Sequence, residues 1–239
     1  MEKQTEKKWG ICLKHLKMHE YIIRKATLGD TAFLATTIIG AEKNGGDKLG
    51  LSTLYGIPEQ EIHALLCNML EEEVEECEFS ISSFLIVTYN DEPVAALGGW
   101  IEGFQQKIKS SILKSNLVGF YFSKESIQKA YSRREIISDV LIDRENLTLQ
   151  IEYLYVDKDH RGKGLAEKLI RQHIDNARSV YPALKKVQLQ PYRSNETAVK
   201  LYHRCGFQIT QSFISSNMEI LDYLPHNERL LMEKELEQP

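Results

Sequence analysis

Two periodicities of apolar residues run along the chain and predict its secondary structure. Short runs in which apolar residues alternate with polar ones, or fill the whole run, are typical of β-strands. Such runs lie at 20–26, 83–88, 93–101, 147–156, 186–190, 207–213 and 229–233. The polar residues 89–92 join the second run to the third, which predicts an antiparallel hairpin within a mixed sheet.

Apolar residues at helical spacing predict helices between these strands. The helix expected over 164–180 has the clearest pattern, because one of its faces is apolar. That face carries Leu165, Leu169, Ile170, Ile174 and Ala177. Further helices are expected to begin near Asp30, Pro58 and Asn195 and to span 123–140.

This order of elements predicts an α/β fold of the α+β type, with helices flanking a central sheet. The chain has 239 residues, of which 42% are hydrophobic, enough for one substantial core. We expect a single domain over 20–239, with a helical insertion at about 103–143 between two strands. Residues 1–19 are polar and lysine-rich and read as an N-terminal extension.

Composition and charge exclude several classes of protein. A net charge of −4 argues against nucleic acid as a partner. The charged start lacks the apolar segment of a signal peptide, and no run reaches the roughly 18 apolar residues that a membrane span needs. The cysteines are dispersed, which favours free thiols, and no spacing suggests a metal site; they are Cys12, Cys67, Cys77 and Cys205. We therefore expect a cytoplasmic protein without membrane contact.

The most informative stretch is 151–170, where an apolar run breaks into a basic turn that opens into a helix. Gly162 and Gly164 lack a Cβ, so the backbone N–H groups of the turn can close around an anion. The new helix adds its first-turn donors and the positive end of its dipole. Arg161 and Lys163 add positive charge, and the turn is thus predicted to bind phosphate.

Spacing separates the known phosphate motifs at this turn. A P-loop needs Ser or Thr after Gly-Lys, whereas Gly164 follows Lys163 here. The dinucleotide-binding fingerprint needs a third glycine, and this sequence places Glu167 there, whose carboxylate would repel a pyrophosphate. The remaining pattern is Arg161-x-x-Gly164-x-Ala166.

With that pattern, the chain resembles the GNAT superfamily of acetyl-coenzyme A-dependent N-acetyltransferases. Leu154-Tyr155-Val156 before the turn is also similar to this superfamily, and so is the segment after it, which begins at Asn195 and ends in Gly206-Phe207. Together these segments cover roughly 147–213. The resemblance implies a mostly antiparallel sheet that is splayed between its fourth and fifth strands to admit acetyl-CoA as cosubstrate.

The resemblance also implies roles for individual residues. The backbone groups of Leu154, Tyr155 and Val156 would pair with the pantetheine arm of the coenzyme, and Asn195 would bond nearby. Tyr202 would be the general acid that protonates the leaving thiolate. The pyrophosphate would be held by the amides of the turn, namely those of Arg161, Gly162, Lys163, Gly164, Leu165 and Ala166.

Glu152 is the candidate general base, because strand alternation places it on the same face as Leu154 and Val156. Two other interpretations stay open: Glu152 forms a salt bridge, and the enzyme draws neutral amine from solution. Direct attack of the amine on the thioester in a ternary complex is the expected mechanism. A covalent acetyl-cysteine at Cys205 is the alternative.

The acceptor is the least determined part of the prediction. A small-molecule amine is expected; a protein lysine or N-terminus is the alternative, and a non-catalytic acyl-CoA-binding module is a third reading. The acidic run at 71–78 would attract a cationic amine or would simply be a solvated face. The insertion at 103–143 would lie over the acceptor side as a lid or form a homodimer contact.

Overall fold

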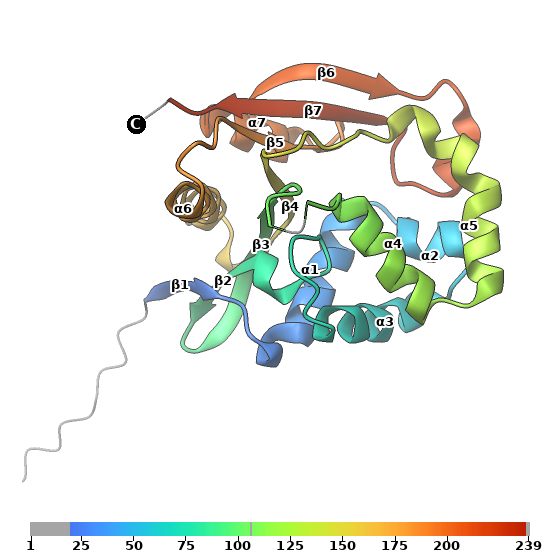
Figure 1. The fold of residues 1–239 in the computed structure, drawn as a ribbon, viewed down its shortest axis with the longest axis horizontal. Helices are drawn as coiled ribbons and strands as arrows, with labels where there is room; N and C mark the ends of the chain where they lie inside the picture. The colour runs from blue at the N-terminus through green and yellow to red at the C-terminus, as the bar shows by residue number, and fades with distance from the viewer. Residues whose placement is uncertain (1–19, 106, 238–239) are drawn as a thin grey trace, which may run out of the picture.

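A single seven-stranded sheet runs through the molecule in the order β1-β2-β3-β4-β5-β7-β6 (Figure 1). The computed structural model describes residues 20–105 and 107–237, so the extension expected at 1–19, with Cys12, lies outside the described residues. The strands are β1 (Tyr21–Lys25), β2 (Phe84–Tyr89), β3 (Glu92–Ile101), β4 (Leu149–Val156), β5 (Lys186–Leu189), β6 (Gln208–Ile214) and β7 (Glu228–Glu235). Neighbouring strands pair antiparallel except for β4 and β5, which are parallel. The prediction of a mixed, mostly antiparallel sheet is confirmed.

Helices cover both faces of the sheet (Figure 1). They are α1 (Thr31–Lys43), α2 (Gly50–Tyr55), α3 (Glu59–Glu71), α4 (Ser110–Tyr121), α5 (Lys124–Ile137), α6 (Leu165–Val180) and α7 (Glu196–Arg204). Because side chains alternate along a strand, β2 supplies two cores. Leu85 and Val87 join the core on the α6 side, and Phe84 and Ile86 join the core beneath α1 and α3.

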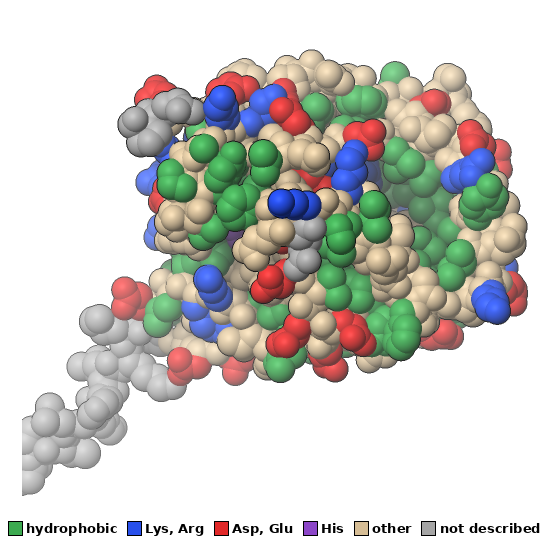
Figure 2. Space-filling view, viewed as in Figure 1, with side chains coloured by type: hydrophobic (Ala, Val, Ile, Leu, Met, Phe, Trp, Pro, Cys, Tyr) green, Lys and Arg blue, Asp and Glu red, His purple; other side chains and the backbone are tan. Residues whose placement is uncertain are grey.

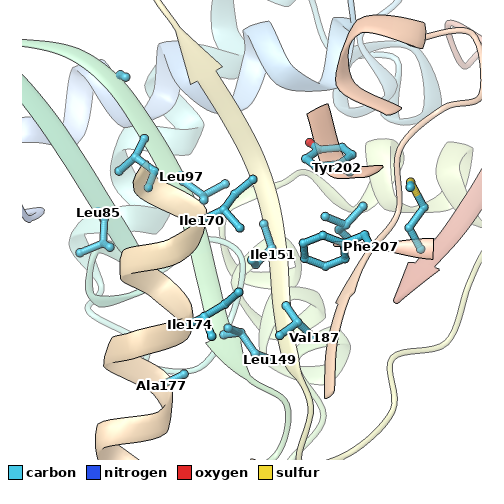
Figure 3. Close-up of a cluster of buried hydrophobic side chains, with 14 of the residues drawn as sticks. Leu85, Leu97, Leu149, Ile151, Ile170, Ile174, Ala177, Val187, Tyr202 and Phe207 are labelled. Atoms are coloured by element: carbon cyan, nitrogen blue, oxygen red, sulfur yellow. The ribbon is translucent and has the colours of Figure 1, made fainter. Parts of the chain in front are cut away.

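The α6-side core positions the parts of the molecule that follow β4. The buried stripe of α6 faces β2, β3 and β4, and Figure 3 shows Ile170, Ile174 and Ala177 pointing toward the strands. Tyr202 of α7 and the neighbouring Phe207 belong to the same core. The helix that begins after the glycine turn is therefore fixed against the sheet along its length.

The sheet splays open between β4 and β5. Their parallel pairing covers Leu149–Ile151 of β4 and Val187–Leu189 of β5, and the described part of β4 beyond Ile151 has no register partner on β5. The buried side chains of Gln150 and Gln188 hydrogen-bond across this seam at 2.9 Å. The two strands thus stop pairing at Ile151 and Leu189, as the predicted splay between the fourth and fifth strands requires.

A β-bulge in β4 corrects one step of the sequence reasoning. Glu152 pairs with Gly98 and Tyr155 with Ala96, so β4 carries one residue more than β3 across this interval. The backbone accommodates the extra residue at Tyr153, which has a φ of 55°. Because the bulge shifts the alternation, Ile151 and the later Leu154 and Val156 pack on the α6-side core, whereas Tyr153 packs on the other core. The expectation that Glu152 shares a face with Leu154 and Val156 is wrong.

The segment between β3 and β4 is more helical than its sequence pattern indicates. The helix expected over 123–140 is α5, capped by the Ser123 hydroxyl and followed by a short 3-10 turn at Ser138–Val140. The helix α4 before it was not predicted, and neither was α2.

The acidic run at 71–78 is only partly exposed to solvent, because Glu76 and Glu78 are buried. None of the helices in the described ranges has the length and apolar composition to cross a bilayer.

Candidate active site

The turn between β4 and α6 presents backbone N–H groups to open space. Gly162 and Gly164 have φ values of 73° and 72°, a region that favours glycine. A Cβ built at either position would meet no atom of the described residues within 4 Å. Within those residues, no backbone N–H from Gly162 to Glu167 donates to a backbone carbonyl. The turn therefore offers a run of unused donors at a helix N-terminus, which suits an anion.

The basic residues of the turn are held in different ways. The Nε of Arg161 donates to the carbonyl oxygen of Val156 at 3.0 Å, which ties the turn to the end of β4. The Lys163 ammonium lies 5.6 Å from the centre of the Tyr21 ring. A hydrogen bond with Tyr21 raises the pKa of Lys163, so this lysine stays charged beside the turn.

The end of β4 has one open edge. Val156 pairs with Ala95 and Tyr155 with Ala96 on the β3 side, and on the β5 side the register stops at Ile151. The backbone of Leu154 to Val156 therefore borders the splay and can accept a further extended chain, as an open sheet edge does. The splay leads from this edge directly into the glycine turn.

Asn195 stands across the splay at the start of α7. Its Oδ1 accepts a hydrogen bond from the Ala198 backbone N–H at 3.1 Å, the usual role of an N-cap asparagine. Its Nδ2 donates to the Oδ1 of Asn44, just after α1. This contact links the start of α7 to the end of α1.

Tyr202 lies on α7 with its ring in the α6-side core. The ring packs edge-on against Phe207, with a centroid distance of 6.2 Å, and Figure 3 shows the hydroxyl directed away from Phe207. The side chain is 8% exposed and borders the cavity described next. Burial raises the pKa of Tyr202 well above its ordinary value, so the phenol remains protonated at neutral pH.

A cavity of about 230 Å³ lies where the pairing of β4 with β5 stops, with Ile151 and Leu189 in its lining. It brings together four of the predicted site residues, Glu152, Leu154, Asn195 and Tyr202, but not the turn from Arg161 to Ala166, which follows the end of β4. Figure 2 shows the surface hollowed between β7 and the helices α4 and α5. Six charged residues line the cavity, and the sequence analysis did not single out most of them. They are Glu42, Glu78, Glu152, Lys114, Arg144 and Arg229.

Most of these charges form one network. Glu78, 2% exposed, pairs with the Lys114 ammonium at 2.7 Å and with the Arg144 guanidinium at 3.1 Å. Arg144 also pairs with the Oε1 of Glu152 at 2.5 Å and lies over the ring of Trp100. Burial opposes the charge on Glu78, but the two cations outweigh it and lower its pKa to about 2. Glu152 therefore forms a salt bridge, as one of the two other interpretations of its sequence position expected.

Glu42 and Arg229 stand apart from this network. Burial raises the pKa of Glu42, which is half-buried beside the cavity at the end of α1. Arg229, near the start of β7, donates from Nη2 to the Tyr192 hydroxyl at 3.0 Å. Across the described residues, neither side chain has an oppositely charged group within 4 Å. No spacing in the sequence connects these two residues, so sequence reasoning had no signal for them.

The cysteines lie away from this cavity. Cys67, Cys77 and Cys205 are free thiols, as expected. Burial raises the pKa of Cys205, which lowers its thiolate fraction at neutral pH, and the residue borders a different groove. These contacts disfavour an acetyl-cysteine. Within the described ranges, no group of His, Cys, Asp and Glu side chains is arranged to hold a metal ion.

Comparison with known proteins relates this chain to acetyltransferases. The family model "Acetyltransferase (GNAT) family" matches residues 52–207. A probable spermine N(1)-acetyltransferase of Bacillus subtilis subsp. natto (strain BEST195) is 26% identical over 91 residues, which are 38% of this chain and 58% of that protein. The spermine/spermidine N(1)-acetyltransferase of Bacillus subtilis (strain 168) is 25% identical over 91 residues, with the same coverage. The match thus spans a little over half the length of these relatives.

Solved structures share the fold at low sequence identity. An N-acetyltransferase from Staphylococcus aureus Mu50 superposes with a TM-score of 0.64 at 14% identity, covering 89% of this chain and 99% of that one. An agmatine N-acetyltransferase mutant in its apo form gives a TM-score of 0.56 at 14% identity, covering 90% and 99%. An acetyltransferase from Salmonella typhimurium, determined with its cofactor acetyl-CoA, gives 0.51 at 15% identity, covering 92% and 96%.

Proposed function

This chain belongs to the acetyltransferase (GNAT) family, and from that membership we propose that it transfers the acetyl group of acetyl-CoA to the primary amine of a small molecule. One observation carries the proposal: the splay between β4 and β5 lies between a run of unused backbone N–H groups and a cavity lined by Tyr202. The site that would bind the coenzyme phosphates and the site that would carry out acetyl transfer thus lie at different places along the same opening.

The residues of the splay suit coenzyme A. The N–H groups from Gly162 to Glu167 would hold the pyrophosphate, with Lys163 adding charge. The open edge from Leu154 to Val156 would pair with the amides of the pantetheine arm, and Asn195 would lie beside it. Hydrogen bonds to a charged group contribute about 1.5–3 kcal/mol each, so a few of them support micromolar affinity.

The chemistry needs one proton donor and one proton acceptor. As the amine nitrogen bonds to the acetyl carbon and the carbon–sulfur bond breaks, Tyr202 would give its proton to the leaving thiolate. Its raised pKa keeps that proton in place at neutral pH. Glu152, at the same cavity, would take the proton that the amine sheds, directly or through water. Arg144 fixes the orientation of this carboxylate.

The size of the cavity favours a small acceptor. Its volume of about 230 Å³ is below the range of about 300–1,000 Å³ that is typical of ligand pockets. Two relatives named for spermine, and a neighbour in fold named for agmatine, also act on small amines by those names. A protein lysine or N-terminus would have to enter the same restricted space.

The test is release of free thiol from acetyl-CoA with a panel of primary amines. We expect release that depends on both the protein and an amine, with the acetylated amine identified by mass spectrometry. Tyr202→Phe should lower kcat by about 100- to 10,000-fold and leave coenzyme affinity intact. Tyr131→Phe is the matched control, because Tyr131 is 57% exposed on α5. Coenzyme binding without thiol release for any amine would instead identify an acyl-CoA-binding module.

A further inference from the structure

Arg229 lines the cavity and forms no ion pair within 4 Å with any described residue. Its one hydrogen bond among the described residues joins Nη2 to the Tyr192 hydroxyl, and its guanidinium lies 4.8 Å from the centre of the same ring. The Nε is buried and has no hydrogen-bond partner in that part of the chain. The adjacent carboxylate, Glu228, is already paired with Arg193. An unpaired donor of this kind costs free energy unless something else satisfies it.

The other cations of the cavity are already neutralised. Lys114 pairs with Glu78, and Arg144 pairs with both Glu78 and Glu152. Among the described lining residues, Arg229 is therefore the cation without an ion pair. A guanidinium presents N–H groups in a fixed fork that matches a carboxylate.

Glu42 is the carboxylate of the cavity that, like Arg229, forms no ion pair among the described residues. It borders the same cavity, it lies on α1 rather than on β7, and no cation of the described residues lies within 4 Å of it. A ligand that spans these two walls would meet a positive group on one side and a negative group on the other. A diamine would satisfy Glu42 and leave Arg229 facing its positive charge.

We propose that the acceptor is a primary amine that also carries a carboxylate, as an amino acid does, and that Arg229 binds the carboxylate while Glu42 faces the ammonium group. This inference rests on the proposed acetyl transfer and names its substrate class. It departs from the polyamine relatives, because a polyamine offers Arg229 nothing to bind. The coenzyme phosphates are a less suitable ligand, because the unused amides lie in the turn and no residue from Arg161 to Ala166 lines the cavity.

The decisive experiment compares acceptors that differ by one carboxylate. Arginine against agmatine places that carboxylate beside the reacting amine, and 4-aminobutyrate against propylamine places it at the far end. In at least one pair we expect kcat/KM to favour the carboxylate-bearing member by about tenfold or more, which corresponds to about 1.4 kcal/mol. The pair that shows the preference tells whether the acceptor is an α-amino acid or one with a remote carboxylate.

Variants at Arg229 test whether this residue is the cause. Arg229→Met should bring the ratio close to one, because it removes the group that binds the carboxylate, while the KM of acetyl-CoA stays unchanged. Arg229→Lys keeps the charge and should retain part of the preference. Arg134→Met, at an exposed arginine on α5, is the control. Thermal unfolding of each variant checks that it folds.

In turnover, the proposal is overturned if the wild type prefers neither arginine nor 4-aminobutyrate over its partner, or if a preference survives in Arg229→Met. Calorimetric binding of the same pairs, with coenzyme A present, decides the question independently of turnover. If no amine is acetylated but arginine or 4-aminobutyrate still binds more tightly than its partner, acetyl transfer fails and the carboxylate site stands. Equal binding within both pairs would remove the site.

Discussion

Gly164→Ala tests the phosphate-binding turn, because it adds one methyl group at the start of α6. The φ of 72° at this position costs a residue with a Cβ about 1–2 kcal/mol. For a chain of this length, 1 kcal/mol lowers Tm by about 2–4 °C, so Tm should fall by about 2–8 °C. No described atom lies within 4 Å of the added Cβ, so no clash adds to this cost.

The effect on coenzyme binding should be larger than the strain. The open space at Gly164 is the space that the pyrophosphate would fill, so the methyl group would displace at least one charge-assisted hydrogen bond. Such a bond contributes about 1.5–3 kcal/mol, which predicts a Kd for coenzyme A that is about 10- to 150-fold higher. Isothermal titration calorimetry measures this Kd, and thermal unfolding measures the strain.

Gly45→Ala is a matched control for this experiment. Gly45 follows α1 with a φ of 77°, and a Cβ there would also meet no described atom within 4 Å. It should show the same fall in Tm with an unchanged Kd. If Gly164→Ala loses stability to the same extent and binds coenzyme A as the wild type does, the pyrophosphate does not lie at this turn and the assignment is refuted.

Three further predictions concern charged groups. Glu78→Gln leaves Lys114 and Arg144 without their buried partner, so the free energy of unfolding should fall by about 3–5 kcal/mol in urea titrations. Because the folded pKa of about 2 lies below the ordinary 4.5, the stabilisation by Glu78 is present above about pH 4.5 and is lost toward pH 2. A variant as stable as the wild type at neutral pH would contradict this prediction. Burial lowers the pKa of His173 from 6.5 to about 4. As the pH falls, this histidine is therefore protonated in the unfolded chain before it is protonated in the folded one, and the free energy of unfolding should fall by about 3 kcal/mol between pH 6.5 and 4. A His173→Gln variant with the same pH dependence would contradict this prediction. Glu152→Gln should lower kcat/KM about 100-fold at neutral pH and by less at about pH 9, where free amine is abundant, whereas an unchanged pH–rate profile would exclude Glu152 as the base.

The sequence contained the local features of this fold and not its long-range ones. The strands, the glycine turn and the Asn195 cap each depend on residues that are close in sequence, and periodicity or spacing shows them. The helix α4 was missed because its apolar residues do not form one buried face: Leu117 and Val118 are buried, whereas Ile112 and Phe120 are exposed. The bulge at Tyr153 was missed because an inserted residue leaves no mark in an alternating run.

The charge network of the cavity could not be predicted for a different reason. Glu78, Lys114 and Arg144 come from separate segments, and each looks like an ordinary surface residue in the sequence. Glu78 belongs to an acidic run that reads as a solvated face, and only the fold shows that it is 2% exposed. A charge becomes informative when its burial and its partners are known, and both are properties of the tertiary structure.

The seam between β4 and β5 has a consequence for how the splay is kept in place. The residue at which pairing stops decides where the opening begins, and the paired stretch is only Leu149–Ile151 against Val187–Leu189 in the described strands. A slip of β5 by one residue would turn the side chain of Gln188 to the other face of the sheet and break its hydrogen bond with Gln150. Each buried amide left unsatisfied would cost about 1–3 kcal/mol. The hydrogen bond between Gln150 and Gln188 thus fixes the register of β4 and β5, and with it the residue at which their pairing ends and the site begins.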